Sequence, residues 1–117
     1  MRAWQLHEIE TPGGTRSPVV LDSEDSRAVL IGIAPGQELG EHQVRERAWV
    51  IVVDGIVEVE TAGETLSAAA GTLLEFEPTE RRTVRSANGA RVLIVFTPWP
   101  GPGHYPPGET GGSRTSE

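Results

Sequence analysis

The sequence predicts an all-β fold, a sandwich or a barrel built from about six to eight short strands. Three observations support this prediction. Runs rich in β-branched residues recur along the chain, turn-forming residues separate them about every ten residues, and no window of useful length shows the 3.6-residue apolar period of a helix. We therefore expect little helix.

Two strong strand signals lie in the first half of the chain. Residues 26–33 form a β-branched run that Pro35-Gly36 stops, which predicts a strand followed by a turn. Residues 48–53 are apolar on both faces and end at Asp54-Gly55. Because Asp-Gly between two apolar runs favours a two-residue turn, we expect a hairpin there, with residues 56–60 as the half-buried return strand.

Shorter strands follow in the second half. A tight turn is expected at residues 62–64, and Asn88-Gly89 predicts a further hairpin turn. The expected strands between and after these turns are residues 65–67, 72–76, 82–85 and 91–97. From Pro98 onward, prolines alternate with glycines, so the segment cannot form a regular hydrogen-bond ladder.

These patterns divide the chain into three parts. We expect an N-terminal strand or arm over residues 1–25 and a β-barrel over residues 26–98. Residues 99–117 are expected to form an irregular Pro/Gly-rich strap followed by a disordered C-terminal tail.

Composition excludes several classes of function. The 117 residues include no cysteine, so disulfides and thiol chemistry are absent, and no lysine, so no side chain can form a Schiff base. A net charge of −7 argues against a nucleic-acid partner, which requires a basic surface. The N-terminal residues carry no apolar run and no segment approaches about 20 apolar residues. We therefore expect a cytoplasmic protein without a membrane partner.

A central segment has a recognisable spacing of glycine and histidine. Gly36, His42 and Gly55 are spaced as in the first signature of the cupin superfamily, which this segment resembles. In that signature a second histidine and a glutamate stand where this chain has Val44 and Ala48. The resemblance implies a cupin-like jelly-roll β-barrel of the small single-domain bacterial kind.

The second cupin signature is matched only at Gly71. Its proline, glycine, histidine and asparagine positions are occupied here by Glu77, Thr79, Arg82 and Ser86, in that order. The resemblance implies that the histidines and the glutamate of an intact motif would hold a divalent metal inside the barrel. Valine, alanine and arginine cannot replace them, because arginine stays protonated and offers no lone pair. We therefore expect a degenerate metal site with no metal and no cofactor.

The residues at these positions still form a candidate ligand site. Residues two apart on a strand share a face, so the resemblance places the following side chains inside the barrel. They are His42, Val44, Ala48, Val50 and Arg82. An inward guanidinium needs an anionic partner, either a protein carboxylate (Glu38, Glu46, Glu75 or Glu77) or a small organic acid. A register slip of one residue would instead leave both Arg81 and Arg82 at the surface.

Other functions remain open alternatives. One is a metal-independent enzyme of the isomerase, epimerase or cyclase type, in which His42 would move protons. Another is a structural or regulatory dimer module whose barrel is filled. A third is a metal site with other ligands, such as His42 with Glu46 and Glu38. Trp49 should point out of the barrel, where an aromatic side chain favours a homodimer contact.

Overall fold

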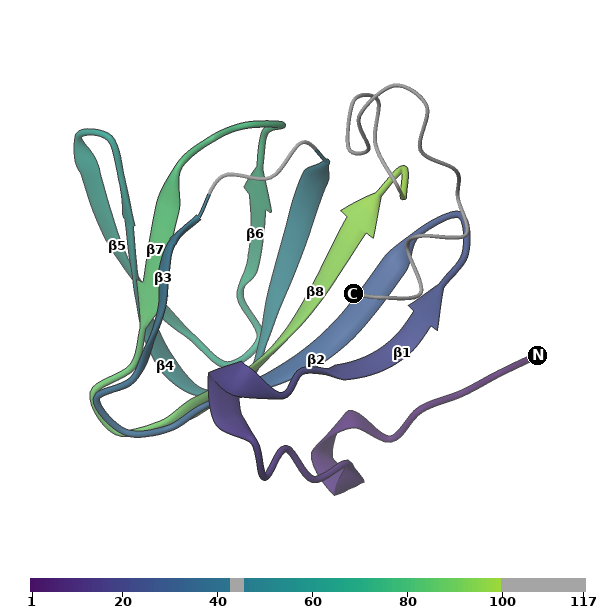
Figure 1. Cartoon of the computed structure of the whole chain (residues 1–117). Helices are drawn as coiled ribbons and strands as arrows, with labels where there is room; N and C mark the ends of the chain where they lie inside the picture. Colours follow the sequence, from purple (N-terminus) through teal and green to yellow (C-terminus); the bar gives the residue numbers. More distant parts are fainter. Residues whose placement is uncertain (43–45, 100–117) are drawn as a thin grey trace.

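The structure, a computed structural model, describes residues 1–42 and 46–99. Strands dominate it, and helix is limited to two short 3-10 turns, so the all-β prediction is confirmed (Figure 1). In chain order the elements are η1 (Leu6–Glu8), η2 (Gly14–Arg16), β1 (Val19–Ser23), β2 (Arg27–Ile33), β3 (Glu38–His42), β4 (Arg47–Thr61), β5 (Glu64–Ala69), β6 (Leu73–Phe76), β7 (Arg82–Arg85) and β8 (Ala90–Thr97).

The long strand β4 forms part of both walls of the curled sheet. Its first part, up to Gly55, pairs with β8 in one wall, and β6 lies on its other side. Its second part, from Ile56, pairs with β5, and three of these residues also pair with β7 in the opposite wall. Strand β2 continues the first wall beyond β8, and β3 continues the second beyond β7. The two walls therefore enclose an interior (Figure 1).

The predicted hairpin at Asp54-Gly55 is wrong. The chain passes through these residues without reversing, and the pairing register with β8 shifts between Val52 and Asp54. The shift leaves Val53 as the extra residue of a bulge. Gly55, two residues further on, takes a φ of 81° and lies against the backbone of Gly89, where β4 passes from one wall into the other. The hairpin lies further on, where Thr61 pairs with Glu64 across a two-residue turn, as the turn prediction for residues 62–64 required.

Asn88-Gly89 also forms a turn without forming a hairpin. Strand β7 pairs with β3 and β4, whereas β8 pairs with β2 and β4, so the two strands on either side of this turn do not pair with each other. The turn instead carries the chain between the walls. A two-residue turn signal identifies a change of direction, but the partner of the next strand depends on distant sequence.

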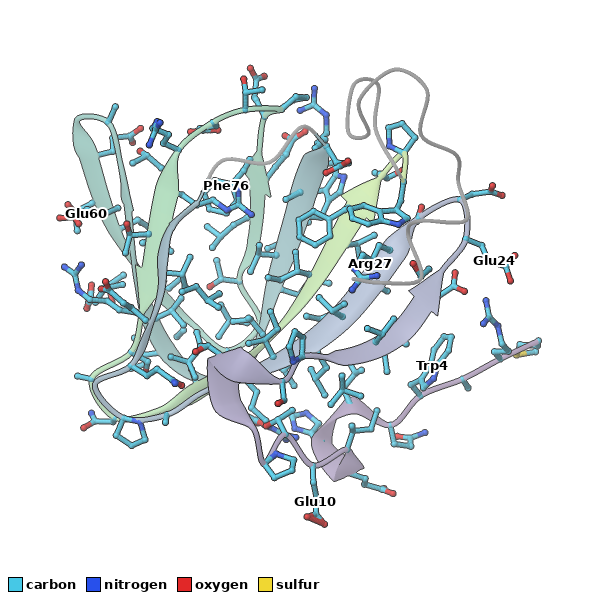
Figure 2. All side chains as sticks on the ribbon, in the orientation of Figure 1. Trp4, Glu10, Glu24, Arg27, Glu60 and Phe76 are labelled. Atoms are coloured by element: carbon cyan, nitrogen blue, oxygen red, sulfur yellow. The ribbon has the colours of Figure 1, made fainter. Side chains whose placement is uncertain are left out.

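The core lies between the two walls and follows the period of two. Ala48, Val50 and Val52 on β4 are at most 1% exposed, and on β8 Val92 and Ile94 are buried with them. In the second wall Val57 and Val59 are buried while Glu60 is exposed, which confirms the half-buried strand expected there. Charged side chains such as Glu60 and Glu24 lie outside, and Phe76 points inward (Figure 2).

The N-terminal arm is fastened to the bend of β4. Arg91 Nη1 donates hydrogen bonds to the carbonyl oxygens of Leu6 (3.2 Å) and Ile9 (2.6 Å), and its Nη2 donates to that of His7 (3.1 Å). The Nε of Arg91 lies 2.8 Å from Asp54 Oδ2, and His7 Nδ1 lies 3.0 Å from Asp54 Oδ1. Asp54 thus holds both the arginine and the histidine of this anchor.

The anchor gives the arm an acid dependence. The hydrogen bond from Arg91 holds the pKa of the Asp54 carboxyl below its usual 3.8, although desolvation opposes this. Because the folded pKa is lowered, the stabilisation is complete above the unfolded value and is lost as pH falls through the folded one. We expect Asp54→Asn to lower the urea midpoint at pH 6, and we expect the difference from wild type to shrink as the pH falls below 3.8.

That experiment has a clear contrary outcome. A difference between wild type and Asp54→Asn that stays constant from pH 6 to pH 2.5 would mean that the carboxylate charge does not contribute. Asp22→Asn is a suitable control, since Asp22 pairs with Arg2 at 3.3 Å elsewhere on the arm and does not contact Arg91.

Within the part of the chain that the structure describes, no helix is long and apolar enough to cross a membrane.

Candidate functional site

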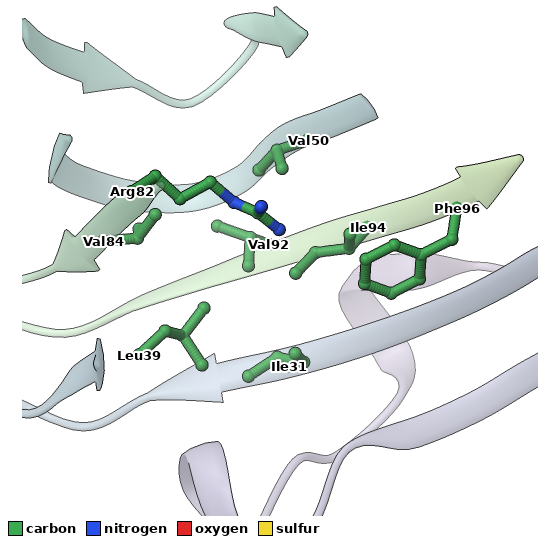
Figure 3. Close-up of a pocket in the computed structure, with 8 residues that line it drawn as sticks. All are labelled: Ile31, Leu39, Val50, Arg82, Val84, Val92, Ile94 and Phe96. Carbon is green, nitrogen blue, oxygen red and sulfur yellow. The ribbon is translucent and has the colours of Figure 1, made fainter. Parts of the chain in front are cut away.

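A cavity of about 70 Å³ lies between the two walls, inside the barrel. Strands β2, β3, β4, β7 and β8 all contribute side chains to it (Figure 3). Among the residues that the structure describes, its lining consists of Ile31, Leu39, Val50, Arg82, Val84, Val92, Ile94 and Phe96. Arg82 is the one charged residue in this set, so the site combines an apolar cavity with a single cation.

The position of Arg82 on β7 decides between the two readings of its register. Arg82 and Val84 are both buried and face the cavity, whereas Arg81 is exposed. Arg85, on the other face of the strand, pairs with Glu60 at 3.3 Å. The guanidinium of Arg82 therefore enters the barrel, and the alternative of a one-residue slip is excluded.

Arg82 is buried without an anionic partner among the residues that the structure describes. Its side chain is 6% exposed, and its Nη1 atom forms no hydrogen bond. Its Cζ lies 4.7 Å from the ring centre of Phe76, a cation–π contact that stabilises the charge in part. Burial lowers the pKa of the guanidinium, while Glu80 raises it. The group remains protonated at neutral pH, since arginine does not titrate in that range.

The carboxylates considered as partners for Arg82 have other positions. Glu75 is hydrogen-bonded to Arg47 at 2.6 Å, and Glu77 lies 4.0 Å from the same guanidinium. Glu38 pairs in register with Arg85. Glu46 is buried and has an interaction partner of its own. Among the described residues, no carboxylate forms an ion pair with Arg82, although the charge of Glu80 acts on it. A ligand anion is therefore a candidate partner for the guanidinium.

The other expected site residues are distributed unevenly. Val50 lines the cavity together with Arg82. Ala48 is fully buried but lies outside the lining, paired in register with both Phe76 and Phe96. The backbone of His42 pairs with that of Arg82 across β3 and β7. Val44 lies outside the described residues.

Most of the cavity wall consists of residues that the sequence did not single out. Strand β8 contributes Val92, Ile94 and Phe96. Ile31 comes from β2 and Leu39 comes from β3. The continuous apolar run of residues 92–96 is a signal that could have marked β8 as a core strand, but it does not tell which of its two faces lines the cavity. Leu39 has no such signal, because its place depends on the pairing of β3 with β7.

The described residues do not fit a divalent metal. They contain no group of three or more histidines, cysteines, aspartates or glutamates arranged to hold an ion. Ala48 and Arg82, which stand where the resemblance puts metal ligands, supply no lone pair. The chemistry that the arrangement supports is the binding of an anion beside an apolar surface.

Comparison with known proteins identifies the architecture. No family model and no curated protein matches the sequence. Among solved structures, an RmlC-like cupin protein from Desulfovibrio desulfuricans is similar over 84% of this chain and 97% of its own, with a TM-score of 0.72 and 22% identity. A protein with a double-stranded β-helix domain from Klebsiella pneumoniae aligns over 84% and 90%, with a TM-score of 0.70 and 20% identity.

A third similar structure is a cupin-2 domain protein from Shewanella frigidimarina. It covers 68% of this chain and 78% of its own, with a TM-score of 0.61 and 16% identity. At such identities the likeness gives the fold and leaves the ligand to be argued from the site itself.

Proposed function

Because the chain has the cupin fold, a double-stranded β-helix that encloses a cavity, we propose that it binds a small anionic organic molecule inside the barrel. One observation carries the proposal: the guanidinium of Arg82 is buried in that cavity with no anion among the described residues to pair it. We assign Arg82 the role of holding the anionic group, and Val50 that of contacting the apolar part.

The energetics of burial support an anionic ligand. An isolated buried charge costs several kcal/mol, so a protein without a ligand would gain by replacing it with an apolar residue. An anion that pairs with the guanidinium offsets this cost through two parallel N–H···O hydrogen bonds in the arrangement that arginine prefers. The apolar lining strengthens the attraction, because an apolar environment screens charges less than water does.

Binding is favoured over catalysis by the composition of the cavity. A metal-independent isomerase or epimerase needs two positioned proton-transfer groups, and the described lining offers only Arg82, which does not titrate near neutral pH. We also assign His42 to the proposed site, as a second polar contact for the ligand. Its backbone pairs with that of Arg82 on the neighbouring strand.

The test compares two arginines of the same strand. A panel of anionic metabolites, in carboxylate-free buffer, is expected to raise the melting temperature of wild type and of Arg85→Gln but not of Arg82→Met. Arg85 lies outside the barrel and is 42% exposed, so its replacement removes one charge without altering the cavity. Equal shifts in both variants would place the ligand elsewhere, and no shift in any protein would reject binding.

A second candidate function is a structural module with a filled barrel. The small size of the cavity favours it, because about 70 Å³ is roughly half the volume of an apolar cavity that holds one benzene. This alternative predicts no melting-temperature shift with any anion. The comparison of Arg82→Met with Arg85→Gln therefore separates the two candidates.

We also propose that the chain forms a homodimer through the outer face of the first wall. Trp49 and Ile51, which alternate with the buried residues of β4, are only half-buried. Trp49 pairs in register with Val95, and Ile51 lies between Leu93 and Leu73. These five residues, the outer apolar patch, include Leu73 at 57% exposed.

The charges around the outer apolar patch suit a second copy of the same chain. Arg47 and Glu75 pair at one end, and Asp54 and Arg91 pair at the other. A rim that carries both signs can pair with its own symmetry mate, whereas a rim of one sign would repel it.

Leu73→Glu is expected to shift the protein towards the monomer, because it buries a charge at the centre of an apolar contact. The loss is expected to be at least about tenfold in the dimer constant, measured by sedimentation equilibrium. Leu66→Glu is the matched control, since Leu66 is 51% exposed on β5 in the other wall. Equal effects of the two substitutions, or a monomeric wild type, would reject this interface.

A cytoplasmic location, and the absence of nucleic-acid and membrane partners, remain predictions from composition.

A further inference from the structure

The lining of the cavity limits the charge of the ligand to one negative group. Seven of the eight lining residues that the structure describes are apolar, and the eighth is Arg82. A second carboxylate on the same ligand would lie among these apolar side chains, with no second cation in the described lining to pair it. Burying such a charge is unfavourable. A phosphate group, with nearly two charges at neutral pH, meets the same difficulty.

The geometry of Arg82 favours a carboxylate as that single group. The guanidinium extends from β7 into the middle of the lining, towards Val50 and Ile94 (Figure 3). Phe76 stacks on it at 4.7 Å, which leaves the N–H groups in the plane of the guanidinium for the ligand. Two such donors match the two oxygens of a planar carboxylate.

The volume of the cavity limits the length of the rest of the ligand. A cavity of about 70 Å³ is roughly half of one that holds the six carbons of benzene, so it suits about three or four non-hydrogen atoms. A carboxylate accounts for three of these atoms, which leaves at most one further carbon for contact with the apolar wall. A longer chain would have to displace close-packed side chains.

We propose that the barrel is selective for short-chain monocarboxylates of the size of formate and acetate. This proposal rests on the proposed function, since it names the class of anion that Arg82 holds. The ligand would lie with its carboxylate on Arg82 and its carbon tail among Ile94, Phe96 and Ile31. A ligand of so few atoms binds weakly, with a dissociation constant no tighter than roughly 10 µM.

A titration series tests the selectivity. Formate, acetate, propionate, butyrate, hexanoate, succinate, inorganic phosphate and acetamide are titrated into wild type at constant chloride, with binding followed by ligand-observed NMR and by melting temperature. Formate or acetate is expected to bind best. Hexanoate, succinate and phosphate should bind at least about tenfold more weakly, and the neutral acetamide should not bind.

Variants that enlarge the cavity give a second readout. Phe96→Leu and Ile94→Val each remove atoms from the wall, so the best ligand should become longer by about one or two carbons. Leu93→Val is the matched control, because Leu93 lies on the outer face of the same strand and outside the lining. Its preference should equal that of wild type.

The outcomes separate this inference from the proposed function. Binding of hexanoate, succinate or phosphate in preference to acetate, lost in Arg82→Met, would overturn the short-chain assignment and leave anion binding in place. An unchanged preference in both enlarged variants would also overturn it. No binding of any compound in the series would count against both, and binding that survives Arg82→Met would place the ligand outside this cavity.

Discussion

Gly55→Ala is expected to lower the free energy of unfolding by about 3 kcal/mol or more. Gly55 has a φ of 81°, which an L side chain adopts at a cost of roughly 1–2 kcal/mol. In addition, an added Cβ would lie 2.4 Å from the carbonyl oxygen of Gly89 and 2.9 Å from Cα of Ala90. Both neighbours are backbone atoms held between the walls, so neither can move aside. Urea denaturation followed by tryptophan fluorescence measures the loss.

Gly63→Ala separates backbone strain from the steric clash. Gly63 has a φ of 84°, but no atom lies within 4 Å of the position that an added Cβ would take, so only the strain of about 1 kcal/mol is expected. Losses of equal size at Gly55 and Gly63 would show that the close approach at the bend of β4 contributes nothing.

Arg82→Met is expected to raise the free energy of unfolding by about 1–2 kcal/mol in the absence of ligand. The substitution removes a buried charge that no described residue pairs, and it supplies an apolar side chain of similar length. The net gain already allows for the lost contact with Phe76, which subtracts roughly 1 kcal/mol. Calorimetry should record a melting temperature about 5–10 °C higher.

The control for this prediction is Arg85→Met. Arg85 is exposed and pairs with Glu60 at 3.3 Å, so its replacement should change the stability by no more than about 0.5 kcal/mol. A destabilised Arg82→Met would mean that the guanidinium stabilises the fold through its own contacts, which would favour the structural module. A stabilised variant that no longer binds anions would mark Arg82 as a residue kept at the expense of stability.

The sequence is informative where local signals decide the structure. The strand at residues 82–85, the turn at residues 62–64 and the buried alternation of Val57 and Val59 all follow from composition and period, and the structure has each of them. The signal at Asp54-Gly55 is misleading, because a bulge and a hairpin turn use the same residue types. Only the distant partners β5 and β8 decide between them.

The candidate site is predictable to a smaller extent. The cupin resemblance implies inward positions for Arg82 and Val50, and both line the cavity, but the sequence alone left a one-residue slip at Arg82 open. The volume of the cavity could not be predicted, since it depends on how side chains from five strands pack against one another. Ala48 illustrates the difficulty, because it lies between two phenylalanines rather than in the lining.

The course of β4 through both walls also has a consequence for the folding rate. Only two of the strand pairings in the described chain, β1 with β2 and β4 with β5, join strands that follow each other directly. Strand β2 and the first part of β4 both pair with β8, which comes much later in the sequence. Such pairings require long loops to close, and the chain entropy is lost before any contact compensates for it. We therefore expect folding to take about milliseconds to seconds. During synthesis, the wall that β2 and the first part of β4 share cannot be completed until β8, the last strand described, has left the ribosome.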